Sequence, residues 1–247
     1  FERIYNHFGL PLNGACVNGL HEIGGGSPIV WRDYKTFLER TPEDVLVKLL
    51  NVRHAVTWRG AMTTPAGVEI PWFLLARGSF EGKDASTYRL DWTPKDTRGA
   101  WVAPAVNTGS DDETYRVMAQ PGFDPFAQVL TPSSYILDSD QGGGSVAVEG
   151  KAAGYAKIAV NVTGGAVVAV SEAYHPNWVA LVDGRPVRPI RVYGALLGVP
   201  VSAGASTIEL SYRPLELYVG AAITALTVLI VLALLLRDRA RAAHSAM

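Results

Sequence analysis

A run of twenty uncharged residues near the end of the chain constrains the fold more than any other feature. Residues 217–236 read LYVGAAITALTVLIVLALLL. At about 1.5 Å per residue, a helix of this length is about 30 Å long, which matches the hydrocarbon core of a bilayer. The run is too long for a buried core helix and lies at the wrong end of the chain for a signal peptide. We therefore predict one transmembrane helix over residues 217–236.

The charges that flank this run predict its orientation. Three arginines follow it within residues 237–241, whereas Arg213 before it is balanced by Glu216. Because positively charged flanks stay in the cytoplasm, we expect a cytoplasmic tail at 237–247 and an extracytoplasmic location for the residues before the helix.

The start of the chain offers no means of export. Phe1 is preceded by no Met, and no basic or apolar leader follows it. We expect export elements upstream of Phe1, which would make the chain the C-terminal piece of a longer membrane protein. The alternative is a tail-anchored protein whose large domain stays in the cytoplasm, against the charge bias.

Composition removes several classes of function. The net charge of −1 gives no electrostatic reason to expect nucleic acid as a partner. Cys16 is the one cysteine, so the chain has no intramolecular disulfide and no cysteine-based metal cluster, and we expect a buried, inert thiol there.

The first part of the chain, residues 1–65, is predicted to be a mixed lead-in of helix, loop and strand. Apolar residues in IVWRDYKTFLER follow helical spacing. A second helix should follow, with Thr41 as its N-cap and Pro42 at its first position. The segment VRHAVTW after it is a strand candidate.

Residues 66–214 show the pattern of an antiparallel β-sandwich or jelly roll, so the predicted fold class is mainly β. Short alternating runs recur about every ten residues and are separated by Gly, Pro, Asn or Asp. Asp183-Gly184 predicts a type I′ hairpin, and QGGGS at 141–145 reads as a flexible link. The predicted strands include TYRVMAQ, FAQVLT, SVAVEG, GYAKIAVNVTG, GAVVAVSEAY, NWVALVDG, PVRPIRVYG, ALLGVPVSAG and STIELSYRP.

Motifs for catalysis or metal binding are weak in this sequence. It contains neither GxSxG nor HExxH, and the glycines at 24–26 lack nucleotide-loop spacing. The acidic cluster at 111–113 could bind a cation, but a solvated loop tip is the favoured interpretation, because no further oxygen ligands follow at calcium-loop spacing.

An aromatic corner in SEAYHPNWVALVDG is the main candidate site. Tyr174, His175 and Trp178 could contact a glycan, because aromatic faces stack on the C–H groups of a sugar ring. The favoured interpretation is structural: Pro176 and Asn177 turn the chain between two strands, and Trp178 packs under the corner.

Several segments resemble bacterial YfhO-type membrane proteins. FERIYN, GLHEIGGGSPI, WRDYKTFL and LVKLLNVRHAVT are similar to the start of that family's extracytoplasmic region. VVAVSEAYHPNWVALVDG and the hairpins after it resemble a later Tyr-Tyr-Pro-Gly-Trp and Val-Asp-Gly segment, and the apolar run resembles the last membrane span. His175 replaces the second Tyr and Asn177 replaces Gly; since Asn also tolerates positive φ, we expect Asn177 to keep the turn.

The resemblance implies membership in the GT-C class of integral membrane glycosyltransferases, which transfer a sugar from a polyprenyl-phosphate donor to an acceptor outside the cytoplasm. The acidic catalytic residues of that class lie in an early loop that no part of this chain matches, so no catalytic residue is assigned. No cofactor is expected in the chain itself, and any divalent metal would belong to the upstream membrane part.

Two functions follow as hypotheses. In the first, the chain is the extracytoplasmic part and last span of a YfhO-like glycosyltransferase and is inactive alone. Its partners are then membrane lipid, the polyprenyl-phosphate sugar and the glycan acceptor. In the second, it is a membrane-anchored, non-catalytic sandwich that binds surface polysaccharide or a partner protein.

Overall fold

The computed structural model describes residues 3–7, 21–22, 31–57, 72–80, 83–92, 97, 99–135 and 141–245. The chain forms two compact units, Phe1–Ser211 and Tyr212–Met247, and each is described by itself. Cys16 and the glycines at 24–26 lie outside the described residues. Strands predominate in the first unit, which confirms the predicted mainly β class.

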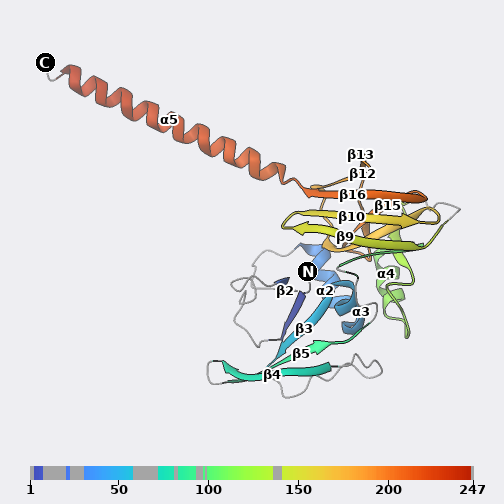
Figure 1. The fold of residues 1–247 in the computed structure, drawn as a ribbon. Coiled ribbons are helices and arrows are strands. Elements are labelled where there is room, and N and C mark those ends of the chain that lie inside the picture. The colour runs from blue at the N-terminus through green and yellow to red at the C-terminus, as the bar shows by residue number, and fades with distance from the viewer. Residues whose placement is uncertain are drawn as a thin grey trace. The chain divides into compact units, whose positions relative to one another are not determined.

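The first sheet combines strands from the lead-in with strands from the segment after it (Figure 1). Its order is β2-β1-β3-β5-β4; β1 is parallel to β2 and β3, whereas β5 is antiparallel to β3 and β4. The β3–β5 pair therefore joins residues from both sides of position 65. The strands are β1 (Arg3–His7), β2 (His21–Glu22), β3 (Val52–Thr57), β4 (Trp72–Phe80) and β5 (Lys83–Leu90).

Two further sheets pack face to face as a β-sandwich. One has the order β13-β12-β16-β10-β9 and the other β14-β15-β11-β6, and each pairs its neighbours antiparallel where the register is defined. A parallel pair, β7 (Ala105–Thr108) and β8 (Val129–Pro132), completes the unit. The sandwich strands are β6 (Ala100–Ala103), β9 (Gly144–Ala152), β10 (Tyr155–Val162), β11 (Ala166–Ala173), β12 (Trp178–Val182), β13 (Arg185–Val187), β14 (Ile190–Val192), β15 (Leu196–Val201) and β16 (Gly204–Tyr212).

Strand β11 is buried on both faces. Val168 and Val170 belong to the sandwich core, together with residues of β10 and β16 on the facing sheet. Val167 and Ala169 point the other way, into a second core that includes side chains of the helices. Successive residues of a strand face opposite sides, so a strand between two cores must be apolar at every position. This explains the unbroken run GAVVAV.

In the described part of the first unit, three helices cover the second core. They are α2 (Arg32–Arg40), α3 (Glu43–Leu49) and α4 (Asp111–Met118), and they contribute buried residues such as Phe37, Val47 and Met118. The structure confirms the two helices predicted in the lead-in, but the N-cap of α3 is Pro42 rather than Thr41. Thr41 instead ends α2, and its Oγ1 is buried without a hydrogen-bond partner.

Helix α4 corrects the prediction that TYRVMAQ forms a strand. Ser110 is the N-cap, and its Oγ accepts a hydrogen bond from the backbone N–H of Glu113 at 3.2 Å. Asp111 and Asp112 lie in the first turn, where the helix dipole favours negative charge. The sequence Ser-Asp-Asp-Glu thus has the spacing of a capping box, which starts a helix before the apolar residues of TYRVM.

Gly142 and Gly144 of QGGGS lie against neighbouring backbone, so this segment is part of the packed sandwich and not the flexible link that was predicted. Gly142 N–H donates to the carbonyl of Gly165 at 3.1 Å, and the carbonyl of Gly143 accepts from Thr163 N–H at 3.0 Å. A Cβ added at Gly142 or Gly144 would collide with neighbouring backbone. The absence of side chains here allows the close approach of two backbone segments.

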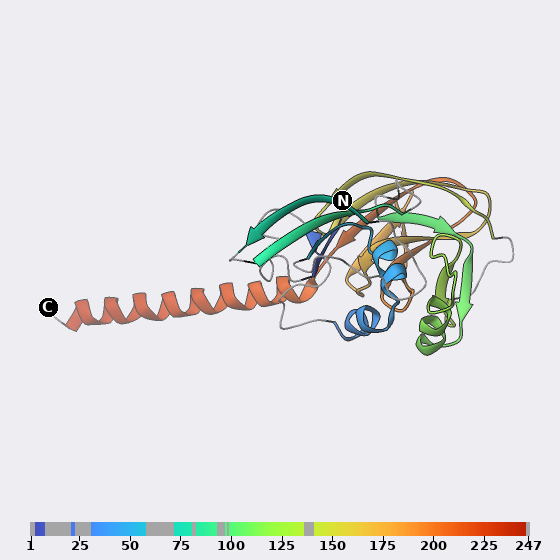
Figure 2. The same ribbon diagram turned by 90° about the horizontal axis from the view of Figure 1, so that it is seen from below.

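The second unit contains the helix α5 (Leu215–Ser245), which is continuous in both views (Figures 1 and 2). Over Leu215–Arg237 its mean hydropathy is 2.8. Its leucine, isoleucine and valine side chains are about half exposed, so a stable environment for them must be apolar. The predicted span at 217–236 is therefore confirmed as a helix of sufficient length and composition, extended at both ends.

A buried tyrosine predicts that the fold weakens in alkali. Tyr193 is fully buried, and its hydroxyl lies 2.7 Å from the carbonyl of Pro125 and 2.8 Å from that of Gln128. Burial raises the pKa of Tyr193 above its ordinary value of about 10, and burial likewise raises the pKa of Tyr115 to about 12. The phenols of the unfolded chain therefore lose their protons at a lower pH than those of the folded chain. The contribution of these two tyrosines to stability should be constant below pH 10 and should fall as the pH rises above it.

Urea unfolding between pH 7 and 11, followed by tryptophan fluorescence, measures this loss. Tyr193→Phe should lower stability at pH 7 by about 1–3 kcal/mol, because the carbonyls of Pro125 and Gln128 lose the tyrosine donor and Trp101 Nε1 keeps only its bond to Pro125. It should also reduce the dependence on alkaline pH. An equal alkaline loss in the variant and the parent protein would contradict the assignment.

Candidate functional site

The aromatic corner connects β11 to β12 through a four-residue turn. Trp178 N–H donates to the carbonyl of His175 at 3.0 Å, which places Pro176 and Asn177 at the centre of the turn. Asn177 N–H also donates to His175 Nδ1 at 3.1 Å. Among the described residues, the non-glycine positions with positive φ do not include Asn177, which corrects the expected left-handed conformation. Proline at the first central position suits a turn built from negative φ values.

Trp178 has both a structural and a surface role. Its ring is partly buried and packs against the sandwich core. Its Nε1–H donates to the carbonyl of Ala173 at 3.1 Å. This hydrogen bond connects the start of β12 to the end of β11. The same side chain lines a pocket, so the packing and ligand interpretations of Trp178 do not exclude each other.

The pocket that Trp178 lines has a volume of about 240 Å³. It is somewhat smaller than the clefts of about 300–1,000 Å³ that hold drug-sized ligands, so a single small ring is a suitable occupant. Tyr155, which is 40% exposed, contributes a second aromatic ring. The remaining described lining consists of charged and small or apolar residues: Arg3, Lys151, Ala152, Ala153, Gly154, Ala156, Glu172 and Leu210.

A carboxylate between two cations forms the polar side of this pocket. Glu172 Oε1 lies 2.7 Å from Lys151 Nζ and 3.2 Å from Arg3 Nη2. All three side chains are mostly buried, with exposed fractions of 27%, 11% and 15%. Arg3 also donates through Nη1 to the carbonyl of Leu50 at 3.2 Å. These ionic contacts join β1, β9 and β11, and partial burial strengthens them relative to surface ion pairs.

Two of these charges, Arg3 and Glu172, influence the pKa of Tyr34 in α2. Burial raises the pKa of Tyr34 above its ordinary value, Arg3 opposes the rise and Glu172 adds to it. The phenol is therefore neutral at physiological pH.

The other two predicted ligand residues lie beside the pocket. Tyr174 packs against the sandwich core, and its N–H donates to the carbonyl of Ala195 at 2.8 Å. His175 contacts Trp31 edge to face, with ring centroids 4.3 Å apart, and Trp31 is 62% exposed. Of the three aromatic candidates, the described lining of the pocket includes only Trp178.

Sequence reasoning missed the charged half of the pocket. Glu172 lies in the segment SEAYHPNWVALVDG, close behind the apolar run of β11. A charged residue at the end of a buried strand is a sequence signal from which its role could have been predicted. Arg3 and Lys151 belong to strands far from it in sequence, and no local pattern predicts that they meet Glu172.

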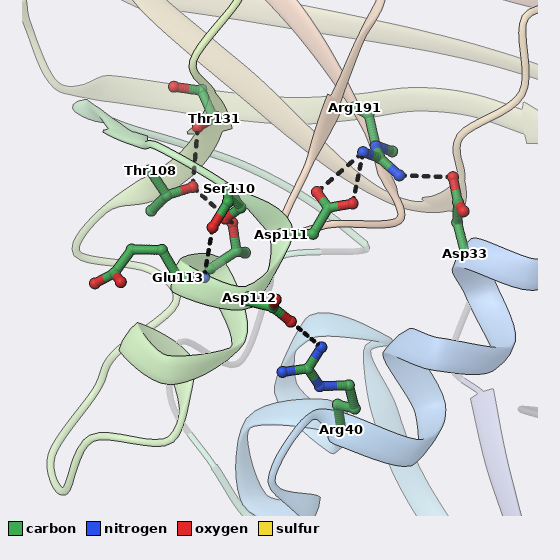
Figure 3. A network of polar contacts seen from close by, with 10 residues as sticks. Asp33, Arg40, Thr108, Ser110, Asp111, Asp112, Glu113, Thr131 and Arg191 are labelled. Carbon is green, nitrogen blue, oxygen red and sulfur yellow. Dashed lines mark hydrogen bonds and ion pairs between the residues drawn. The ribbon is translucent and has the colours of Figure 1, made fainter.

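The acidic cluster forms ion pairs between elements (Figure 3). Arg191 of β14 binds both carboxylate oxygens of Asp111 at 2.9 Å and Asp33 Oδ2 at 2.6 Å. Nη2 makes both contacts to Asp111 and Nη1 makes the contact to Asp33, so one guanidinium bridges two carboxylates. The contacts therefore connect β14 to the starts of α2 and α4.

The other two carboxylates of the cluster also contact arginines. Asp112 accepts from Arg40 Nη1 at 2.5 Å, and Glu113 pairs with Arg116 one helical turn away. No group of three or more His, Cys, Asp or Glu side chains in the described part of the chain could hold a metal ion. Asp111 and Asp112 are thus exposed as predicted and Glu113 is partly exposed, but the three residues form a helix start rather than a loop tip.

The Asp183-Gly184 turn connects β12 to β13 and also contacts β16. Both residues have positive φ, 50° and 76°, which is the requirement of a type I′ hairpin. Asp183 Oδ1 accepts from Thr207 N–H at 2.8 Å, while Asp183 N–H donates to the carbonyl of Thr207 at 2.9 Å. The turn thus anchors the short β12–β13 hairpin to the next strand.

Truncation of Trp178 tests its packing role. Trp178→Ala should destabilise the first unit by somewhat less than the ~3–5 kcal/mol of a fully buried aromatic, because the ring is only partly buried. Trp178→Phe keeps most of the apolar contact and should lose about 1 kcal/mol through the missing bond to Ala173. Thermal unfolding of the full chain in detergent measures both; unchanged midpoints would contradict a structural role.

Substitution of Asp183 tests the hairpin. Asp183→Ala should cost about 2 kcal/mol, the sum of left-handed strain in a residue with a Cβ and one lost hydrogen bond to Thr207. Asp183→Asn is the matched control, because Asn tolerates positive φ and keeps an acceptor oxygen. Urea unfolding distinguishes them, and equal losses in the two variants would argue against this role.

Comparison with known proteins finds one similar family, which matches part of the chain. Residues 146–224 match the family described as Bacterial membrane protein YfhO. No curated protein and no solved structure matches the chain. The matched segment extends from β9 through the aromatic corner and the Asp183 hairpin into the first turns of α5. The YfhO resemblance is therefore confirmed over this segment, and the apolar helix at Leu215–Arg237 agrees with a piece of a membrane protein of this type.

Proposed function

We propose that this chain is the extracytoplasmic, acceptor-side part of a YfhO-like glycosyltransferase, and that the pocket at Trp178 contacts a glycan. The pocket is the observation that carries the proposal, because it combines two aromatic rings with a carboxylate and two cations in a space suited to one sugar ring. Chemical transfer is assigned to a membrane region upstream, in keeping with the GT-C resemblance, and the chain alone is expected to be inactive.

The lining chemistry fits a saccharide. Tyr155 and Trp178 offer apolar ring surface for sugar C–H groups. Glu172 can accept hydrogen bonds from sugar hydroxyls, and Lys151 and Arg3 can donate to them. Because Trp178 Nε1 already donates to Ala173, the indole contributes its ring rather than a further hydrogen bond.

The proposal also assigns an orientation. The arginines at 237, 239 and 241 favour a cytoplasmic end for α5, so the sandwich lies on the opposite side of the membrane. A polyprenyl-phosphate sugar and its glycan acceptor meet on that side in GT-C enzymes.

Binding of immobilised oligosaccharides to the full chain in detergent tests the glycan contact. The probes are neutral, uronate-bearing and phosphate-bearing oligosaccharides. Tyr155→Ala and Glu172→Gln should each weaken binding about tenfold or more, which corresponds to about 1.4 kcal/mol. Trp31→Ala is the matched control, since Trp31 is exposed but lies outside the described lining. No binding by the parent chain, or equal losses in all three variants, would refute the pocket's assignment.

Transfer of labelled sugar from a polyprenyl-phosphate donor tests the enzymatic half of the proposal. The upstream reading frame and this chain should be active when expressed together, whereas this chain alone should not be. A gene in which no multi-span region with an outer acidic loop precedes Phe1 would exclude the transferase. Glycan binding would then favour the alternative, a membrane-anchored, non-catalytic binding module.

A further inference from the structure

Strand β4 lies at the margin of the first unit and ends the strand order of its sheet (Figures 1 and 2). Phe73, Leu74 and Leu75 are consecutive, and their exposed fractions are 47%, 45% and 51%. The other exposed large hydrophobic residues in the described part of this unit stand apart from one another in sequence: Trp31, Val106 and Tyr155. Three consecutive exposed apolar residues form a patch on this strand that, unlike scattered single residues, indicates a surface that is covered in the working protein.

A bulge in β4 disfavours the pairing of this edge strand with a strand of another protein. β4 ends the strand order of its sheet, with β5 as its one neighbour among the described strands. The β4–β5 register shifts between Leu74 and Ala76, so Leu75 is an extra residue in a bulge. A bulge twists an edge strand and interrupts the regular row of hydrogen-bonding groups that another strand would pair with.

The residues around the patch have the composition of a lipid-facing surface. Exposed Arg77 follows the leucines two residues after Leu75. Arg89 of β5 pairs with Phe73, and its guanidinium carbon lies 5.7 Å from the centre of the Phe73 ring. Aromatic and aliphatic side chains flanked by arginines are typical of segments at the level of lipid headgroups, where the cations meet anionic phosphates.

The connection to the span holds this unit near lipid. β16 ends at Tyr212 and α5 begins at Leu215, so only Arg213 and Pro214 lie between them. Three residue steps cover at most about 11 Å. A domain attached by so short a connection stays at the bilayer surface, where an exposed apolar patch can leave water without another protein.

We propose that Phe73, Leu74 and Leu75, with Arg77 and Arg89, form a second membrane contact that inserts into the headgroup region of the bilayer. This contact is independent of the glycan pocket. It would limit rotation of the unit about its connection to α5 and hold the sandwich at a defined height above the membrane.

A depth-dependent fluorescence measurement on the full chain tests the proposal. Cys16 is the chain's one cysteine, so Cys16→Ser gives a background for single labels. Leu75→Cys carries an environment-sensitive fluorophore in vesicles of phosphatidylcholine and phosphatidylglycerol. Ala119→Cys is the control, because Ala119 is an exposed position at the end of α4. Circular dichroism checks that both labelled proteins are folded.

A label at position 75 should emit at shorter wavelength than the control and lose emission when lipids carry a nitroxide near the headgroup. The control should keep the emission of a water-exposed dye. Emission at position 75 equal to the control would overturn the proposal. Shielding from water without quenching by the spin-labelled lipid would also overturn it, and would point to contact with a second copy if the shielding increased with the protein-to-lipid ratio.

Discussion

The burial of β11 on both faces is the constraint on which the rest of the first unit depends. Side chains that alternate along this strand fill the sandwich core on one side and the helix-covered core on the other. Ser171, near its end, extends the connection: its Oγ donates to the carbonyl of Leu49 at 2.6 Å, at the last residue of α3. A strand held between two cores cannot slip by one residue without exchanging its faces, so its C-terminal end has a fixed position.

The candidate site occupies that fixed end. Glu172 lies one residue beyond Ser171, where the strand leaves the cores and a carboxylate can reach both a pocket and its cations. The turn that follows returns Trp178 to the sandwich, and its indole N–H binds the carbonyl of Ala173. The pocket is therefore built by the same segment that organises the core, so its polar and aromatic walls are held in place by the fold.

Local patterns account for much of the fold and little of the site. The strands after residue 144 follow from two-residue alternation and turn residues, and the span follows from length and hydropathy. The strand prediction for TYRVMAQ is wrong because the spacing of its apolar residues suits both a strand and a helix. The N-cap Ser110 is the local signal that favours the helix. QGGGS was interpreted as flexible because composition does not reveal close packing. Trp178 was identified from its local sequence, but Arg3 and Lys151 reach Glu172 through tertiary pairing.

Hydrogen exchange followed by mass spectrometry on the full chain tests the central claim, that β11 couples the two cores and positions the pocket. The amides of 166–173 should exchange only when the whole first unit unfolds, with the same free energy as those of β15 and α3. Peptides from the β12–β13 hairpin should exchange earlier through local opening. Exchange of β11 as early as the hairpin, or a free energy of opening different from that of α3, would contradict a single cooperative unit built around this strand.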